Sequence, residues 1–272
     1  MRFTPQISLA LTMAMQGVLT IPSATARCSE GLVNIVFNDN YTQSQLAQVT
    51  GATNWLTFRF GTAPKQIPML PQNKEGVDKA IAAVTGPNPP DYLLTFNEPD
   101  LDYKTGEEQL SATDAAELIA PLLKKRGTHT KLIAPVLANQ TKPWLDDFYR
   151  LCKCQDAFDL YNVHIYRPTV AEAKAEVQTF RDKFNDKPLW ISEIAPAHLT
   201  GSCPTTIPWD KSLQFMQEIY AWGETVDWIH KIFWNSGNEI HCSDTNVAAS
   251  FLVDKSDKPT PLLKPFNELT CS

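Results

Sequence analysis

Two glutamates far apart in the chain each stand at the end of a short apolar run. Glu98 follows Leu93–Asn97 and precedes Pro99, and a proline ends a strand because it lacks an amide donor and fixes φ. Glu193 ends the run Leu189–Ser192. Two carboxyl groups at one mouth suit glycosidic bond cleavage, in which one protonates the leaving oxygen and the other, ionised, attacks or stabilises the anomeric carbon.

The side-chain direction of Glu193 supports this pairing. Glu193 shares its strand parity with Leu189 and Ile191, which we expect to face the core. A single glutamate at a strand end is more often a solvated acid or an ion-pair partner, so the prediction depends on the pair. A carboxyl separation of about 5–5.5 Å would mean retention of anomeric configuration, and about 6.5–9.5 Å would mean inversion. The sequence leaves that distance open.

Four further residues could contact a sugar at the same place. Asn97 could hydrogen-bond a sugar 2-hydroxyl, Tyr166 could contact the nucleophile or the substrate, and His164 stands at a strand end. Trp234 could form the floor under a sugar ring, because aromatic faces pack against the apolar faces of sugars. Each has a structural alternative, namely capping for Asn97, packing for Tyr166 and Trp234, and a satisfied core histidine for His164.

The elements that must position these residues alternate between short apolar runs and amphipathic stretches. The predicted strands are Leu32–Phe37, Trp55–Phe60, Gln66–Leu70, Tyr92–Phe96, Lys131–Val136, Leu160–Ile165, Leu189–Ser192 and Trp228–Phe233. The clearest predicted helices are Thr113–Arg126, Trp144–Cys152, Ala171–Phe184 and Leu213–Glu224. Eight strands with helices between them predict an α/β chain that forms a single (β/α)₈ TIM barrel. An open doubly wound sheet is the alternative, because periodicity alone cannot close a barrel.

Other classes of function find no support in the sequence. No Gly-x-Gly follows a strand, no Gly-x-Ser-x-Gly is present, and the five histidines lack a metal-ligand spacing. We therefore expect no cofactor and no metal. The net charge of −6 argues against nucleic acid and anionic membranes as partners. We expect a monomer whose partner is a polysaccharide or oligosaccharide.

The first residues resemble an export signal. Arg2 precedes the mainly apolar run Ile7–Leu19, and Ala24–Ala26 has the small-x-small form of a cleavage site. We predict a signal peptide over residues 1–26, a catalytic domain over residues 27–272, and secretion to the extracellular space or cell wall. An N-terminal membrane anchor is the alternative.

The cysteines agree with export. All six lie beyond residue 26, and an even number in an exported chain indicates disulfides, with fifteen possible connectivities. We expect Cys203–Cys242, because both fall in loops after late strands, and Cys28–Cys271, which would join the termini.

Three motifs together resemble glycoside hydrolase family 128, the endo-β-1,3-glucanases with an Asl1-like catalytic core. They are Thr95–Leu101, Val163–Tyr166 and Trp190–Glu193, and the similarity covers nearly the whole chain after residue 26. The resemblance implies a retaining barrel with Glu98 as acid/base after the fourth strand and Glu193 as nucleophile after the seventh, acting on β-1,3-glucan. The family typically has Tyr-Asn-Trp where this chain has Phe58–Phe60.

That departure concerns sugar subsites more than chemistry. Two alternatives therefore stay open. One is a glycosidase or transglycosidase that acts on another β-linked glycan. The other is a glycan-binding cell-wall protein without catalysis.

Overall fold

The structure is a computed structural model that describes residues 31–37, 43–102, 105, 108–197, 207–236, 250–254 and 256–269. The predicted signal peptide and the cysteines at 28, 203, 242 and 271 lie outside these residues. Within the described part of the chain, no helix has both the length and the apolar character needed to cross a membrane.

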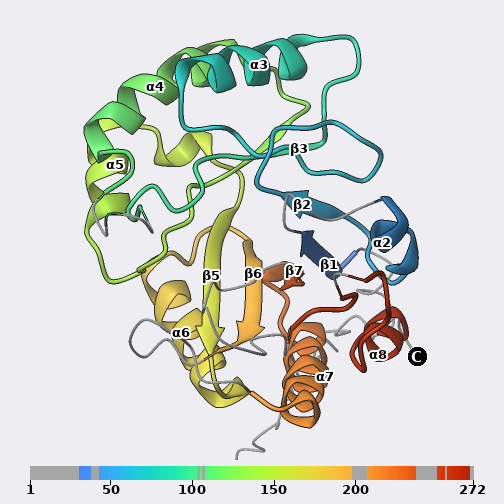
Figure 1. The fold of residues 1–272 in the computed structure, drawn as a ribbon. Helices are drawn as coiled ribbons and strands as arrows, with labels where there is room; N and C mark the ends of the chain where they lie inside the picture. Colours follow the sequence, from blue (N-terminus) through green and yellow to red (C-terminus); the bar gives the residue numbers. More distant parts are fainter. Residues whose placement is uncertain are drawn as a thin grey trace, which may run out of the picture.

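Seven parallel strands form two sheets (Figure 1). They are β1 Val33–Phe37, β2 Trp55–Thr57, β3 Tyr92–Leu94, β4 Lys131–Ile133, β5 Tyr161–Arg167, β6 Leu189–Pro196 and β7 Ile229–Asn235. Five strands make one sheet in the order β2-β1-β7-β6-β5, and β3 pairs with β4 in the other. Parallel strands separated by helices confirm the predicted α/β class.

The two sheets are joined by isolated bridges rather than by continuous strands. Parallel bridges link Trp55 to Gln66, Met69 to Leu94, and Ile133 to Leu160. The predicted third strand, Gln66–Leu70, is therefore reduced to two bridged positions. Pro68 lies in its middle and has no amide hydrogen for a ladder. Consequently, no barrel closed by continuous ladders is present among the described strands, and the predicted closed barrel of eight strands is correct only at the level of a parallel α/β fold.

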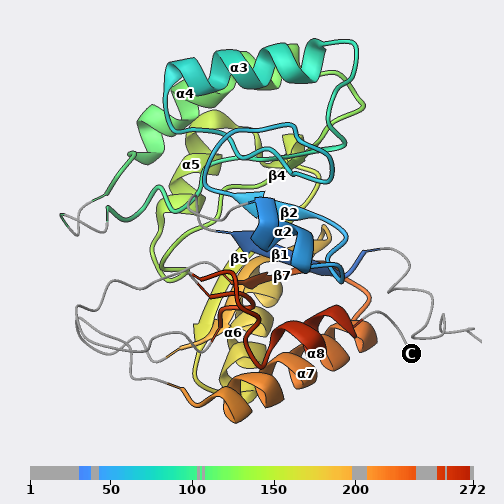
Figure 2. The same ribbon diagram turned by 45° about the vertical axis from the view of Figure 1, so that its right-hand side comes forward.

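A helix follows each of the seven described strands along the chain (Figures 1 and 2). They are α2 Gln43–Gln48, α3 Lys74–Thr85, α4 Ala112–Lys125, α5 Trp144–Cys152, α6 Val170–Lys183, α7 Trp209–Thr225 and α8 Leu263–Asn267, with a 3₁₀ turn at Gln155–Ala157. Three begin at side-chain caps, because Asn73, Ser111 and Thr169 accept hydrogen bonds from Gly76, Asp114 and Glu172 amides. These caps explain why the helices start where they do.

Two apolar clusters divide the strand residues by the direction of their side chains. The outer core lies between strands and helices. The inner core is formed by residues of strands or bridged positions, together with Ile67 between the bridged Gln66 and Met69: Val36, Leu56, Ile67, Met69, Leu94, Ile133, Leu160, Trp190 and Phe233. On β7, Ile232 and Trp234 belong to the outer core, whereas Phe233 belongs to the inner core. This alternation decides which residues at the strand ends can meet one another.

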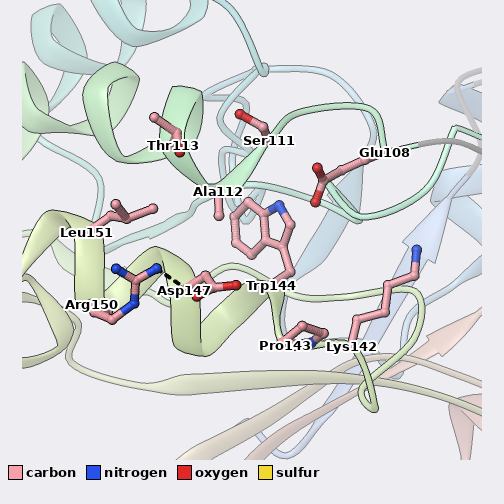
Figure 3. A pocket seen from close by; sticks show the side chains of 10 residues that line it. All are labelled: Glu108, Ser111, Ala112, Thr113, Lys142, Pro143, Trp144, Asp147, Arg150 and Leu151. Atoms are coloured by element: carbon pink, nitrogen blue, oxygen red, sulfur yellow. Dashed lines mark hydrogen bonds and ion pairs between the residues drawn. The ribbon is translucent and has the colours of Figure 1, made fainter.

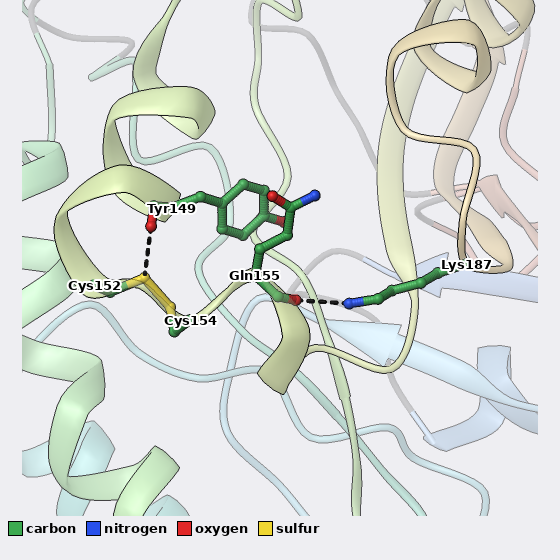
Figure 4. The surroundings of a disulfide bond; sticks show 5 residues. All are labelled: Tyr149, Cys152, Cys154, Gln155 and Lys187. Carbon is green, nitrogen blue, oxygen red and sulfur yellow. Dashed lines mark hydrogen bonds between the residues drawn. A yellow bond between two sulfur atoms is a disulfide. The ribbon is translucent and has the colours of Figure 1, made fainter.

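A disulfide joins Cys152 to Cys154 at the end of α5 (Figure 4). Lys153 between them adopts a left-handed conformation with φ of 52°, which ends the helix and turns the two cysteines toward each other. This pair is not among those predicted from the sequence. It leaves the other four cysteines available for the two predicted pairs, which lie outside the described residues.

Candidate active site

Glu98 follows β3 in a turn that separates it from the strand. Its φ of 47° is rare for a residue with a side chain, and its amide donates to the Val136 carbonyl at 2.8 Å. Pro99 and Asp100 occupy the middle of a turn closed by the Leu101 amide, which donates to the Glu98 carbonyl at 3.2 Å. Proline is favoured at that position of a turn, so the Glu-Pro-Asp order itself bends the chain here.

A β-bulge in β6 determines the direction of Glu193. Ile191 pairs with Ile232 of β7 and Ile194 pairs with Trp234, so Ser192 and Glu193 together lie opposite one residue. Leu189 and Ile191 belong to the outer core and Trp190 to the inner core. Regular alternation would therefore send Glu193 outward, and the parity argument from the sequence was wrong. The extra residue reverses the alternation and pairs Glu193 with His164.

Three side chains from neighbouring strands hold the two carboxyl groups. His164 on β5 lies between them, with Nδ1 at 2.7 Å from Glu98 Oε1 and Nε2 at 3.5 Å from Glu193 Oε1. Tyr166 donates its hydroxyl hydrogen to Glu193 Oε2. Asn235 at the end of β7 donates to the same oxygen at 3.1 Å, and also to the Tyr166 hydroxyl.

The two carboxyl groups are close together and almost fully buried. One atom each from Glu98, His164 and Glu193 lie within 4.8 Å of one another, and the exposed fractions of the two glutamates are 8% and 3%. These residue types also bind metal ions. However, His164 directs a different ring nitrogen at each carboxylate: Nδ1 forms a hydrogen-bond contact with Glu98, and Nε2 forms a longer ion-pair contact with Glu193, so the three groups do not converge on one ion.

Burial and mutual repulsion set the protonation of this cluster. Burial raises the pKa of Glu193 to about 7; the charge of His164 opposes this, and the charge of Glu98 adds to it. The hydrogen bonds from Tyr166 and Asn235 also favour the ionised form of Glu193. Burial lowers the pKa of His164, but the negative charges of Glu193 and Glu98 outweigh that effect and raise it. Glu193 is therefore partly protonated near neutral pH.

Two oxygen atoms at the site have no hydrogen-bond partner within the described structure. Glu193 Oε1 accepts no hydrogen bond, although Oε2 accepts two, and Asn97 Oδ1 is also buried without a donor. Asn97 directly precedes Glu98, and its main-chain carbonyl accepts from Gln72. Buried oxygens without donors are uncommon, and both atoms can accept a hydrogen bond from a ligand.

The structure brings most of the predicted site residues together, but not all of them. Glu98, Glu193, His164 and Tyr166 form one connected cluster. Trp234 does not join it. This side chain is fully buried in the outer core, packs near Phe215 of α7, and donates its indole hydrogen to the Ser250 carbonyl at 2.7 Å.

Asn235 takes the position that the sequence analysis gave to Trp234. Strand alternation carries this information, because Phe233 faces the inner core and a residue two positions later faces the same way. A polar side chain directly after the apolar end of β7 was thus a signal that the sequence already contained.

A separate hollow of about 330 Å³ lies between the N-terminal ends of α4 and α5 (Figure 3). Its lining includes Ser111, Trp144 and Asp147, with Lys142 at one edge. Trp144 is only 3% exposed, and its indole donates to the Leu110 carbonyl at 2.8 Å. Ser111 caps α4. These side chains are already engaged within the protein, so the carboxyl cluster remains the candidate site.

Comparison with known proteins places this chain in a recognised family. The profile described as glycosyl hydrolase catalytic core matches residues 31–266, which confirms the resemblance identified from the sequence. A search of curated protein sequences gave no match.

Similar folds occur among solved structures of glycoside hydrolase family 128. A subgroup V exo-β-1,3-glucanase from Cryptococcus neoformans matches with a TM-score of 0.71 and 19% identity, over 89% of this chain and 100% of that one. A subgroup I endo-β-1,3-glucanase from Amycolatopsis mediterranei, in complex with laminaritriose, matches with a TM-score of 0.66 and 21% identity, over 88% and 100%. A subgroup VII oligosaccharide-binding protein from Trichoderma gamsii matches with a TM-score of 0.67 and 17% identity, over 87% and 93%.

Proposed function

Because the chain belongs to the glycosyl hydrolase catalytic core family, we propose that it is a secreted retaining hydrolase of β-1,3-glucan. The observation that carries this proposal is the meeting of Glu98 and Glu193 through His164, with one atom of each within 4.8 Å. This close approach of the carboxyl groups supports retention, for which they are about 5–5.5 Å apart, over inversion, for which they are about 6.5–9.5 Å apart. The parallel strands and their bridges are consistent with a (β/α)₈ barrel whose mouth holds both groups.

In the first step, Glu193 attacks the anomeric carbon of a bound sugar. Oε1 is the attacking atom, because Oε2 is held by Tyr166 and Asn235. A bond forms between Oε1 and the anomeric carbon while the bond to the leaving oxygen breaks, and Glu98 gives its proton to that oxygen. The leaving sugar then carries a hydroxyl group, and the remaining glycosyl group is an ester of Glu193.

In the second step, a water molecule attacks the anomeric carbon and the ester bond to Glu193 breaks. Glu98, now ionised, accepts the proton of that water and returns to its starting state. Two displacements at one carbon restore the original anomeric configuration. No cofactor takes part.

His164 links the charges of the two steps. When Glu193 becomes an ester it loses its negative charge, and the attraction between Glu193 and the imidazole decreases. Because the Nδ1 atom of His164 lies 2.7 Å from Glu98, this change reaches Glu98 through one ring. Asn97 Oδ1, buried and without a donor among the described residues, fits the 2-hydroxyl of the reacting sugar, a hydrogen bond that strengthens in the transition state.

Secretion is part of the proposal and has separate support. Residues 1–26 have the composition of a signal peptide, and the Cys152–Cys154 disulfide fits an oxidising compartment. N-terminal sequencing of the protein recovered from culture medium should begin at Arg27. A start at Met1 would contradict cleavage.

The test of the catalytic proposal is incubation with laminarihexaose, with product sizes followed by chromatography. Glu193→Ala should abolish turnover, and Glu98→Ala should reduce it roughly 10²–10⁴-fold, least with an activated leaving group. Unimpaired hydrolysis by either variant would remove that residue from its role. Parallel assays with cellulose and mannan decide whether another β-linked glycan is preferred, and the appearance of longer oligosaccharides would indicate sugar transfer.

One alternative function has a specific observation in its favour. The subgroup VII proteins of similar fold bind oligosaccharides, so the same scaffold also serves binding alone. Under this alternative, the wild-type protein would bind laminari-oligosaccharides without release of reducing sugar. Both glutamates and their partners from β5 and β7 are present here, which is why we favour catalysis.

A further inference from the structure

We propose that Asp100 is a positioning residue that holds the acid/base Glu98 in the position from which it transfers its proton. This inference rests on the proposed function, because a positioning role needs a reaction to serve. Asp100 is two residues beyond Glu98 and is fully buried. Among the described residues its carboxylate makes no hydrogen bond with Glu98 or Glu193 and binds backbone amides instead, so it acts through the backbone.

The backbone at Glu98 needs support from elsewhere. Its φ of 47° lies in the left-handed region, which a residue with a side chain adopts at a cost. Such a conformation persists only when the surroundings over-determine it. The ladder between the segments after β3 and β4 cannot supply all of this support, because it ends at the bond from the Glu98 amide to the Val136 carbonyl. The Glu98 carbonyl, which would be the next acceptor in this ladder, accepts the Leu101 amide hydrogen instead.

The side chain of Asp100 adds hydrogen bonds to the segment after β4, beyond the last backbone hydrogen bond of the ladder. Oδ1 accepts the amide hydrogen of Ala138 at 2.8 Å, and Oδ2 accepts that of Asn139 at 3.1 Å. Val136 is bound to the turn through the Glu98 amide, and Ala138 and Asn139 are bound to the same turn through the Asp100 carboxylate. Hydrogen bonds to an ionised group are stronger than those between neutral groups.

Lys142 makes two further contacts with Asp100. Lys142 Nζ lies 3.6 Å from Asp100 Oδ2 and donates to the Asp100 main-chain carbonyl. Lys142 thereby balances the charge of a carboxylate that has no access to water. The negative charge of Asp100 also contributes to the raised pKa of His164, which shows that it lies within electrostatic reach of the catalytic groups.

The test compares two substrates that differ in their need for an acid. Cleavage of laminarihexaose requires a proton from Glu98, whereas a 2,4-dinitrophenyl β-laminaribioside has a leaving group that departs without one. In Asp100→Asn, one oxygen becomes an amide nitrogen that cannot accept an amide hydrogen. We expect kcat/KM for laminarihexaose to fall about 10²-fold, the cost of a displacement of roughly 1 Å, and kcat/KM for the aryl substrate to change much less.

The chain offers a matched control in Asp159. Its Oδ2 accepts the Leu132 amide at 2.8 Å and the Arg126 guanidinium at 2.9 Å, at the opposite ends of β4 and β5. Asp159→Asn makes the same chemical change to a carboxylate with a backbone and a cationic partner. It should leave the ratio of the two kcat/KM values within about twofold of wild type.

Each outcome decides between the roles. A selective loss on laminarihexaose supports positioning of the acid. An equal loss on both substrates would contradict it and indicate a general structural role, while the proposed function would stand. A wild-type protein inactive on both substrates would contradict the proposed function and this inference together. If Asp100→Asn does not fold, Lys142→Met gives the decision, because it must show the same selective loss at smaller size.

Discussion

The hydroxyl of Tyr166 offers the sharpest test of how the nucleophile is held. Tyr166→Phe removes the hydrogen bond to Glu193 Oε2 and leaves the aromatic ring in place. That hydrogen bond favours the ionised form of Glu193, whose pKa is about 7. Its removal should therefore raise the pKa of Glu193 and shift the lower limb of the pH–rate profile to higher pH.

The size of this shift follows from the contacts. A hydrogen bond to a charged group is worth roughly 1.5–3 kcal/mol, which corresponds to about 1–2 pKa units. Asn235 still donates to the same oxygen at 3.1 Å and limits the loss. We therefore expect the lower limb of kcat/KM to move upward by about one pH unit, so that activity at pH 7 falls several-fold and recovers in large part near pH 9.

The assay is the pH dependence of kcat/KM on an activated aryl β-laminaribioside, which reports ionisation of the free enzyme. Tyr161→Phe is the matched control. Tyr161 lies on the same strand and its hydroxyl donates to the Asp186 carboxylate at 2.9 Å, but it lies five residues away at the other end of β5. The control should leave the profile unchanged. A lower limb in Tyr166→Phe that stays in place or moves to lower pH would refute the reasoning.

Three stability measurements follow from buried groups and the disulfide. The pKa of Glu193 is about 7 in the folded state against a reference value of 4.5. The free energy of unfolding of the wild type should therefore fall by up to roughly 3 kcal/mol as the pH rises between those values. Urea unfolding of Glu193→Gln should lack this fall, and the same pH dependence in both proteins would contradict the reasoning. Burial lowers the pKa of Lys231 to about 8, so stability should rise as pH increases from 8 toward 10.5; Lys231→Met should lack that rise in the same assay. Replacing Cys152 and Cys154 with serine opens a loop of three residues and should lower the free energy of unfolding by about 1.6 kcal/mol. The melting temperature should fall by roughly 3–6 °C. An unchanged melting temperature would mean that the disulfide does not constrain the unfolded chain.

The sequence identified both glutamates because each ends an apolar run in a way that simple strand rules describe. Pro99 stops the first run, and the carboxyl ends of parallel strands lie at the same end of a barrel. These rules concern positions along the chain and the identity of strand ends. They were sufficient to predict that Glu98 and Glu193 would meet.

Side-chain direction was harder to predict. No residue type near Ser192 predicts the β-bulge there. The bulge reverses the side-chain alternation that the sequence-based prediction for Glu193 assumed. The same difficulty explains the exchange of Trp234 for Asn235, since one position along β7 separates the outer core from the site. Strand length was limited by Pro68, which interrupts the predicted third strand.

The disulfide shows a different limit. Six cysteines permit fifteen connectivities, and a pair only two residues apart needs a left-handed residue between its members, as at Lys153. A lysine gives no warning of that conformation, because glycine and asparagine are the residues that adopt it readily.

The proposed function requires Glu98 and Glu193 to cleave a β-linked sugar by two displacements at one carbon. Proton NMR of laminarihexaose hydrolysis, recorded within the first minutes, measures the anomeric form of the new reducing end before mutarotation. The β-anomer should appear first and convert slowly to the equilibrium mixture. Initial formation of the α-anomer would contradict the double displacement, and the absence of any new reducing end would contradict hydrolysis of this glucan.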